Sequence, residues 1–550
     1  MKNNSTLGKK TMFDPLSQRY ASKRYPIYAG RAMVNCSMPQ ASAAGLQTML
    51  KGGNAFDAAI AAAAALTVVE PTSNGIGADA FCIAWSAKEH RLVGLNASGP
   101  APLGLSIERV IEDGNAEDGH MPRFGWTPVT VPGAPAAWAA LHDRFAKLTF
   151  AQDLAPAIDY ARNGYPCNPN LSLLWSRGPA RYAATHAPEV FDEWFSTFTK
   201  GGRTPQPGDI ITLPNHADTL EKIADTHAEA MYTGELAKAI DAASRASGGY
   251  IRYEDLARFK PEWVDPISVN YRGYDVCEIP PNGQGIVALI ALNILKNFAF
   301  DAKDVALTYH RQIEAIKIAF GCAFDSVTDP DDTDVDYGKF LTPEFGIEQA
   351  ARIGDTAEVR TTSTPSNSGT VYMCCADDEG NMVSYIQSNF MGFGSGIVIP
   401  NTGIALQNRG YDFSLDPSRP NALKPGKRSY HTIIPGFLMK DGDPVGPFGV
   451  MGGYMQPQGH VQVAMNYIDF GLDPQQALDA PRWRWDDHNN VRVEDRFDTS
   501  IALELQRRGH HMLMSMDLSD FGRGQMIVSP APGVLIGGTE SRTDSNISCL

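Results

Sequence analysis

The stretch Ser366–Asn389, SNSGTVYMCCADDEGNMVSYIQSN, does most to decide the fold of this chain. Its two apolar runs, 370–376 and 382–387, flank the turn sequence DDEGN, and this pattern predicts an antiparallel hairpin. A polar run ends at Gly369, directly before the threonine that opens the first strand. The arrangement is typical of a chain that cuts itself before Thr370 and uses the new terminus as its catalyst.

The chemistry of threonine explains why a cut would be needed. A threonine hydroxyl is a weak nucleophile unless a nearby base takes its proton, and a free α-amino group can be that base. An α-amine has an ordinary pKa of about 7.7–8.0, so much of it is neutral near pH 8. Cleavage of the Gly369–Thr370 bond would create such an amine, and a glycine before the nucleophile leaves the scissile carbonyl uncrowded.

A later glycine pair could supply a second part of such a site. Gly452 and Gly453 follow Met451 in the tripeptide MGG, and glycines let backbone N–H groups approach a developing oxyanion. Threonines before strands and Gly-Gly turns are both common, so their spacing alone does not distinguish a catalytic site from ordinary turns. A wider set of motifs is needed to separate the two interpretations.

Seven further motifs follow one another between about Ala29 and the C-terminus. They are GGNAFDAAIAAAAALTVVEPTSNGIGADAF (Gly52–Phe81), TPVTVPGAPAAW (Thr127–Trp138), DDEGNMVSYIQSNFMGFGSG, LQNRGYDFS, PGKRSYHTIIP, VMGGYMQPQGH and ALDAPRWRW. In this order they resemble the γ-glutamyltransferase family of N-terminal-nucleophile hydrolases. The resemblance implies an α+β fold, the αββα sandwich in which two stacked antiparallel sheets lie between helical layers.

The same resemblance divides the chain at the expected cleavage site. Residues 1–369 would form a large fragment and residues 370–550 a small one, and the two together would make one composite domain. We expect the fragments to stay associated as a heterodimer, since neither buries a complete core; further oligomerisation is left open. The family needs no metal and no organic cofactor, so none is expected here.

The family's catalytic residues can be carried over position by position. Thr370 falls on the processing and catalytic threonine, and Ser388 falls on a second hydroxyl residue that hydrogen-bonds the nucleophile. Gly452 and Gly453 match the oxyanion glycines. Ser388 could instead be a polar strand residue that satisfies backbone groups, but the alignment around it favours the functional role.

Several substrate-binding positions of the family are changed. The early arginine that holds the substrate's α-carboxylate falls on Asn96 or Ser98, depending on the gap chosen, and neither residue is a cation. Two adjacent serines that share this task are replaced by His431 and Thr432. The resemblance therefore implies that one cation has been lost from the site.

A different cation is gained on the opposite side of the site. The asparagine and glutamine that help to hold the substrate's α-amino group fall on Phe390 and Arg409, while the partnering acid is kept as Asp412. A guanidinium at Arg409 would repel an ammonium group and would bind a carboxylate bidentately. The alternative is that Arg409 pairs with Asp412, three residues away, as a structural ion pair.

These residues predict an amidohydrolase or acyltransferase that acts through an acyl-enzyme. Its small-molecule substrate would be a γ-glutamyl-type or related amide whose acyl group carries a carboxylate, and water or an acceptor amine would release that group. A glutaryl or cephalosporin acylase and an oxamate amidohydrolase are the alternatives within this chemistry. The remaining alternative is a homologue that keeps the fold but catalyses no reaction.

Composition limits which binding partners and which cellular location we expect. The chain of 550 residues carries a formal net charge of −15, which argues against nonspecific binding to nucleic acid or to an anionic membrane. Residues 1–26 are basic but contain no apolar run, so we expect no signal peptide and a cytoplasmic enzyme. Eight cysteines without regular spacing predict no disulfide framework.

Periodicity and turn residues predict the remaining elements. Helices are expected over 40–51, 54–66 and 458–467, and most of 135–355 is expected to be helical. Strands are expected over 81–85, 92–95, 403–407, 432–439 and 445–450. Residues 352–369, rich in Thr, Ser and Pro, are expected to be a mobile linker that presents the scissile bond.

Overall fold

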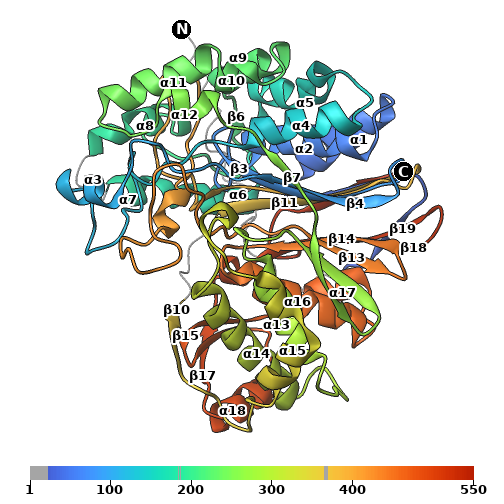
Figure 1. Ribbon diagram of the computed structural model, residues 1–550. Helices are drawn as coiled ribbons and strands as arrows, with labels where there is room; N and C mark the ends of the chain where they lie inside the picture. Colours follow the sequence, from blue (N-terminus) through green and yellow to red (C-terminus); the bar gives the residue numbers. More distant parts are fainter. Residues whose placement is uncertain (1–22, 184, 186–187, 364–368) are drawn as a thin grey trace.

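The computed structural model describes residues 23–183, 185, 188–363 and 369–550 (Figure 1). The α-helices are α1 (Pro39–Leu50), α2 (Ala55–Val69), α3 (Ile107–Glu112), α4 (Ala134–Phe145), α5 (Phe150–Asn163), α6 (Pro169–Ser176), α7 (Gly178–Ala183), α8 (Asp192–Phe198), α9 (Pro214–Asp225), α10 (Glu229–Tyr232), α11 (Glu235–Ala246), α12 (Tyr253–Ala257), α13 (Gly285–Leu295), α14 (Ala306–Phe324), α15 (Pro343–Ala350), α16 (Met455–Ile468), α17 (Pro474–Asp479) and α18 (Thr499–Arg507). The strands are β1 (Ile27–Ala29), β2 (Ala32–Cys36), β3 (Asp79–Ser86), β4 (Arg91–Ala97), β5 (Tyr165–Pro166), β6 (Ile210–Ile211), β7 (Glu262–Val264), β8 (Ile267–Tyr271), β9 (Tyr274–Glu278), β10 (Arg360–Ser363), β11 (Gly369–Asp377), β12 (Met382–Phe390), β13 (Gly436–Lys440), β14 (Asp443–Met451), β15 (Trp483–His488), β16 (Asn490–Glu494), β17 (His511–Ser515), β18 (Arg523–Ala531), β19 (Val534–Thr539) and β20 (Asn546–Cys549).

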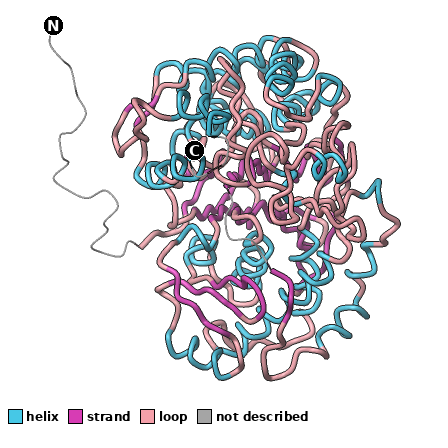
Figure 2. The backbone as a smooth tube through the Cα atoms, turned by 90° about the vertical axis from the view of Figure 1, so that its left-hand side faces the viewer, coloured by secondary structure: helices cyan, strands magenta, loops and turns pink. Residues whose placement is uncertain are grey.

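Two seven-stranded sheets lie face to face between helical layers, as both views show (Figures 1 and 2). The first sheet has the order β20-β2-β11-β12-β3-β4-β7, and the second has the order β1-β19-β18-β14-β13-β9-β8. Helices α1, α2 and α4 pack on the first sheet, and α13, α16 and α17 pack on the second. All neighbouring strands in these two sheets run antiparallel, so the expected α+β sandwich is confirmed.

The two sheets pack closely because glycines and polar side chains let their backbones approach. Tyr372 on β11 lies against Gly449 on β14, where a Cβ would come within 2.5 Å of the tyrosine ring. On β2 the side-chain amide of Asn35 donates to the Gly538 carbonyl of β19 at 2.5 Å. Strand β11, which begins at the expected cleavage site, is therefore held between the second sheet on one side and α2 on the other.

Helix α2 supports the first sheet from outside and is buried along its whole length. The Asn54 side chain caps its first turn by accepting from the N–H groups of Phe56 and Asp57, and Asp57 accepts from the Asn54 N–H at 2.8 Å. The alanine run keeps the helix thin, so α1 and α5 can pack on it while it contacts β11. The helix expected over 54–66 is present and continues to Val69.

Both sheets combine strands from before and after the expected cleavage site. In the first sheet β11 and β12 follow residue 369, whereas their neighbours β2 and β3 precede it. In the second sheet β1, β8 and β9 precede the site, and the other four strands follow it. Residues before and after the scissile bond therefore share hydrogen-bonded sheets.

Some expected elements differ from the structure. Residues 403–407 form isolated bridges to Gly77 and Val398 instead of a strand, and Gly403 has a φ of +71° that suits a turn. The strand expected over 432–439 begins only at Gly436, because the preceding backbone bonds to side chains; Ile434 N–H, for example, donates to Gln456 at 2.9 Å.

Other parts of the fold were not expected. The region 135–355 contains β7, β8 and β9, which complete the edges of both large sheets. A further sheet, β10-β15-β16-β17, lies at the far end of the molecule beside α18 (Figure 1). Strand β10 takes up part of the expected linker 352–369, and residues 364–368 of that linker lie outside the described residues. Residues 1–22, where no signal peptide was expected, also lie outside them. Among the described helices none is long and apolar enough to cross a bilayer.

Candidate active site

Thr370 lies at an irregular position in the pairing of β11 with β12. Gly369 pairs with Phe390, but the next pair in register is Val371 with Gln387, so the ladder shifts at the residue between them. Such a bulge turns a side chain away from its regular direction. Two residues of β12, Ser388 and Asn389, lie opposite Thr370, and the next residue, Phe390, has a φ of +72°, which is strained for a residue with a Cβ.

Three groups on these two strands form a continuous hydrogen-bonded chain. The Ser388 hydroxyl donates to the Gly369 carbonyl oxygen at 2.6 Å, and its oxygen lies 3.0 Å from the Thr370 hydroxyl oxygen. Since the serine has a single proton, Thr370 donates to Ser388 and Ser388 donates to the scissile carbonyl. The Phe390 N–H also donates to the serine oxygen, at 2.8 Å, and holds it in place. The structure thus brings together Thr370, Ser388 and Gly369, as expected.

Arg523 holds the other side of the threonine backbone. Its guanidinium donates to the Thr370 carbonyl at 3.2 Å and to the Ser73 hydroxyl at 3.3 Å. Glu70 pairs with it at 3.0 Å and neutralises its charge. Because Arg523 pairs in register with Met451 on β14, it also brings the expected oxyanion glycines close to the threonine.

Gly452 and Gly453 directly follow β14 in backbone conformations that favour glycine, with φ values of +144° and +59°. Within the described part of the chain, neither N–H group donates a hydrogen bond, whereas both carbonyl groups accept one from α16. A Cβ on Gly452 would come within 3.0 Å of the Gly522 Cα. Two adjacent N–H groups are therefore available for an oxyanion, as this role requires.

A pocket opens beside these glycines and is lined by three arginines, Arg177, Arg181 and Arg523, together with Gly452 and Ser73. Arg523 is neutralised by Glu70, and Arg177 pairs with Asp517 at 3.0 Å. Among the described residues Arg181 forms no ion pair. The pocket therefore has an unmatched positive charge.

The guanidinium of Arg181 lies close to the scissile bond. A Cβ on Gly392 would come within 1.8 Å of the Arg181 Nη1 atom, and a Cβ on Gly369 would come within 2.7 Å of the Gly392 nitrogen. Glycine at both positions therefore lets the arginine, the Gly392 loop and the first residue of β11 stack closely. Arg181 was not expected as a site residue, and no motif in the sequence marks it.

The predicted substrate-binding residues Arg409, Asp412, His431 and Thr432 gather around Asp79, which pairs with Ser388 in the β3–β12 ladder. Arg409 is 1% exposed and donates to the Thr432 hydroxyl at 2.7 Å. Its guanidinium lies 3.7 Å from Asp79 and 3.5 Å from Asp412. It also stacks on the Phe390 ring, with Cζ 4.2 Å from the ring centre.

Burial sets the protonation of this cluster. It raises the pKa of Asp79 and of Asp412 to about 7 each, although Arg409 pulls both values back. Burial and the charge of Arg409 lower the pKa of His431, so its ring is neutral and donates through Nε2 to Asp79 at 3.0 Å. The carboxylates around Arg409 therefore change charge near neutral pH.

Asn96 and Ser98 form a separate network with Asn282. The Asn96 side chain donates to Asn282 at 3.0 Å and accepts from the Ser98 hydroxyl at 2.7 Å. Asn282 in turn accepts from the His431 N–H at 2.9 Å through its carbonyl. The two positions expected to replace an arginine are therefore neutral, buried and linked to the Arg409 cluster.

The sequence did not reveal three residues that the site uses. Asp79, Arg523 and Arg181 come from segments far from Thr370 in the chain, and only the folded sheets bring them together. Asp79 and Glu70 do lie in the motif Gly52–Phe81, but nothing in its spacing indicates a carboxylate beside the serine.

Comparison with known proteins identifies the family. The gamma-glutamyltranspeptidase family model matches residues 41–550. The chain therefore belongs to the gamma-glutamyltranspeptidase family of N-terminal-nucleophile hydrolases, enzymes that act on amide C–N bonds. This confirms the resemblance found in the sequence motifs.

The relatives include several kinds of amide hydrolase. The chain is 35% identical to the glutathione hydrolase-like YwrD proenzyme of Bacillus subtilis, over 92% of this chain and 95% of that protein. It is 32% identical to the oxamate amidohydrolase proenzyme of Klebsiella pneumoniae, over 92% and 96%. The crystal structure of cephalosporin acylase from Bacillus halodurans superposes with a TM-score of 0.94 at 53% identity and covers 98% of this chain and 99% of that one.

Proposed function

We propose that the chain is a proenzyme that cleaves its own Gly369–Thr370 bond and then hydrolyses amides with Thr370 as an N-terminal nucleophile. The hydrogen-bonded chain from Thr370 through Ser388 to the Gly369 carbonyl carries this proposal. The YwrD and oxamate amidohydrolase relatives are both named as proenzymes, which supports the same maturation. The products would be fragments 1–369 and 370–550, which would remain together as a heterodimer because they share both large sheets.

The hydrogen-bonded chain supports a proton path for self-cleavage. The Thr370 oxygen attacks the Gly369 carbonyl carbon, its proton passes to Ser388, and the serine proton passes to the carbonyl oxygen. Collapse of this intermediate breaks the C–N bond, and the proton returns to the departing nitrogen. The resulting ester between Gly369 and the threonine oxygen is hydrolysed by water, which leaves a free α-amine on Thr370.

In the mature enzyme the α-amine would replace this path. It takes the proton from the threonine hydroxyl during attack on the substrate amide. The N–H groups of Gly452 and Gly453 stabilise the tetrahedral oxyanion, and an acyl-enzyme ester forms. Water or an acceptor amine then releases the acyl group. The proposed steps use only groups of this chain and the two reactants.

We further propose that the acyl group carries a carboxylate. The pocket beside Gly452 supports this, because its three arginines include Arg181, which forms no ion pair among the described residues. The oxamate amidohydrolase among the relatives acts on a substrate of this type by its name, and a glutaryl or cephalosporin acylase is the other candidate, favoured by the likeness to the Bacillus halodurans enzyme. Rates with γ-glutamyl-, glutaryl- and acetyl-p-nitroanilide and with oxamate would distinguish these functions.

Arg409 remains the predicted second contact for a substrate carboxylate. Its alternative role as a structural ion pair gains support from its position between Asp79 and Asp412. The test is Arg409→Gln, assayed with glutaryl- and acetyl-p-nitroanilide alongside the melting temperature. A selective loss with the glutaryl substrate supports substrate binding, whereas an equal loss with both substrates supports the structural role.

The first experiment is the intact mass of purified protein. Two fragments that separate after Gly369 in the wild type, with Thr370→Ala remaining whole, would support the proposed maturation. A folded wild-type chain that stays whole would overturn it and would favour a silent homologue.

A further inference from the structure

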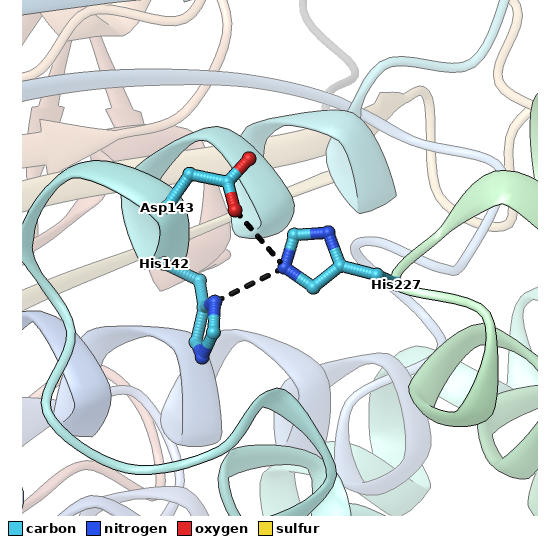
Figure 3. Close-up of side chains that lie close together, drawn as sticks. All are labelled: His142, Asp143 and His227. Carbon is cyan, nitrogen blue, oxygen red and sulfur yellow. Dashed lines mark hydrogen bonds and ion pairs between the residues drawn. The ribbon is translucent and has the colours of Figure 1, made fainter.

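A second cluster of reactive side chains lies away from the candidate active site, in the helical layer over the first sheet. It comprises His142 and Asp143 near the end of α4 and His227 in the turn between α9 and α10 (Figure 3). One ligand atom from each residue lies within 4.8 Å of those from the other two. The figure shows both α4 side chains directed toward the His227 Nε2 atom.

The orientation of His142 is fixed by the backbone. Its Nε2 lies 3.0 Å from the Leu148 carbonyl oxygen, which can only accept, so this nitrogen carries the proton. The lone pair of neutral His142 is therefore on Nδ1, which lies 3.0 Å from the His227 Nε2 atom. A hydrogen bond from one ring nitrogen to a carbonyl is the arrangement that prepares the other nitrogen of a histidine for a metal ion.

His227 is held in place by its backbone and by a ring. His227 and Ala228 both have left-handed φ values, +50° and +67°, and Ala228 is buried. The Phe150 ring packs against both imidazoles, with centroid distances of 5.2 Å to His142 and 4.6 Å to His227. The two ligand nitrogens therefore face one another before any ion binds.

Asp143 completes the cluster with a negative charge. Its Oδ1 lies 3.3 Å from the His227 Nε2 atom, and among the described residues it forms no other ion pair. The neighbouring cations are engaged elsewhere: Arg144 with Glu89, and Lys147 with Glu379. The Asp143 side chain is 70% exposed, which leaves room for it to adjust and for water to complete a coordination shell.

From this geometry we propose that His142, Asp143 and His227 bind a divalent transition-metal ion of the Zn²⁺ type. Two imidazole nitrogens and one carboxylate oxygen are a ligand set typical of zinc, with the fourth position left to water. The ion takes the place of the hydrogen that His227 Nε2 points at its two acceptors, and the neutral ring then carries its proton on Nδ1 instead. The metal cross-links α4 to the α9–α10 turn and takes no part in amide hydrolysis.

A second cluster of two histidines and a carboxylate, also among the described residues, shows why a nearby lysine matters. His310, Glu314 and His510 also converge, but all three are buried, and the Lys317 ammonium already lies 2.7 Å from Glu314. A cation of the protein thus occupies the place that a metal would take. In the part of the chain that the structure describes, no lysine or arginine pairs with Asp143 in this way.

The test is titration of ZnCl₂ into chelator-treated, full-length protein, followed by calorimetry and by melting temperature. We expect a Kd below about 0.1 mM and a rise in melting temperature of about 1–3 °C at saturation. His227→Ala and Asp143→Asn should each weaken this binding at least tenfold. His488→Ala is the matched control, because His488 pairs with one aspartate in an exposed position without a second imidazole.

The outcomes separate the proposal from its alternative. If the wild type binds no Zn²⁺ below about 0.1 mM, or if His227→Ala binds as the wild type does, the histidines form only a hydrogen-bonded pair. The Asp143→Asn variant covers the case in which His227→Ala misfolds, because the Asp143 side chain is exposed.

Discussion

The hydroxyl oxygen of Ser388 lies 3.0 Å from that of Thr370, and this contact joins the nucleophile to the bond that it is proposed to cut. The two residues lie on adjacent antiparallel strands, and the shift in the ladder leaves Ser388 and Asn389 opposite the threonine. The serine proton is committed to the Gly369 carbonyl. One side chain thus contacts both the attacking oxygen and the oxygen that becomes negative.

Replacement of the nucleophile should stop both reactions. Thr370→Ala removes the attacking oxygen, so we expect an intact chain and at least a 10³-fold loss of amide hydrolysis, on the order seen when a nucleophile is deleted. Thr370→Ser keeps the hydroxyl and should still split, more slowly. Intact mass and p-nitroanilide assays measure both. An uncut Thr370→Ser variant would contradict the proposed role of the hydroxyl.

Ser388→Ala should slow self-cleavage by about 10²-fold, because it removes the proton path to the carbonyl oxygen. Ser384→Ala is the matched control: Ser384 is also buried on β12, and it hydrogen-bonds the Tyr372 hydroxyl at 2.7 Å, away from the scissile bond. Gel analysis of the fraction cleaved over time measures the rate. Equal slowing in both variants would mean that Ser388 acts only through the strand.

Gly452→Ala should lower kcat by about 10²-fold, because the new Cβ presses on Gly522 and displaces an oxyanion donor. Gly442→Ala provides the control for backbone strain. Its φ is +87°, and a Cβ there would meet nothing within 4 Å. Steady-state kinetics and melting temperature, measured on both variants, separate lost catalysis from lost stability. Similar kcat values in the two variants would argue against the oxyanion role.

Arg181→Gln should raise KM for glutaryl-p-nitroanilide by about tenfold and leave KM for the acetyl compound unchanged. The reason is that Arg181 is the cation of the pocket without a carboxylate partner among the described residues. Arg181→Lys keeps the charge and should recover part of the affinity. An unchanged KM in Arg181→Gln would show that the pocket does not hold the substrate's carboxylate.

Substrate affinity should also depend on pH. Burial raises the pKa of Asp79 and of Asp412 to about 7, so both gain negative charge as pH rises through that value. If Arg409 contacts the substrate's carboxylate, KM for the glutaryl substrate should increase severalfold between about pH 6 and 8. Asp412→Asn should reduce this increase, and the acetyl substrate should show none. A flat profile would favour the structural role of Arg409.

The predicted cleavage residues, Gly369, Thr370 and Ser388, all lie within one hairpin. Thr370 and Ser388 are eighteen residues apart, and the turn between them sets which strand positions meet. Their contact therefore follows from local pairing and from the family motifs. The helix over 54–66 was predictable for a similar reason, because Asn54 caps a run of small and apolar residues.

The rest depends on contacts between distant segments. Asp79 reaches Arg409 across 330 residues of sequence, and Arg523 reaches Thr370 across 153. No local pattern indicates such pairs, since their charges are matched only after both sheets have formed. The strand expected over 432–439 is shorter than expected because the Ile434 N–H bonds to the side chain of Gln456 on α16 and not to a neighbouring strand.

The interleaved order of the strands determines how the protein could refold after the proposed cleavage. As one chain, the protein can unfold and refold as a single molecule. If it is cut as proposed, β11 and β12 would have no covalent link to β2 and β3, so refolding would require two separate chains to meet and would depend on their concentration. The proposed maturation would thus make the protein an assembly that is protected by slow unfolding more than by reversible refolding.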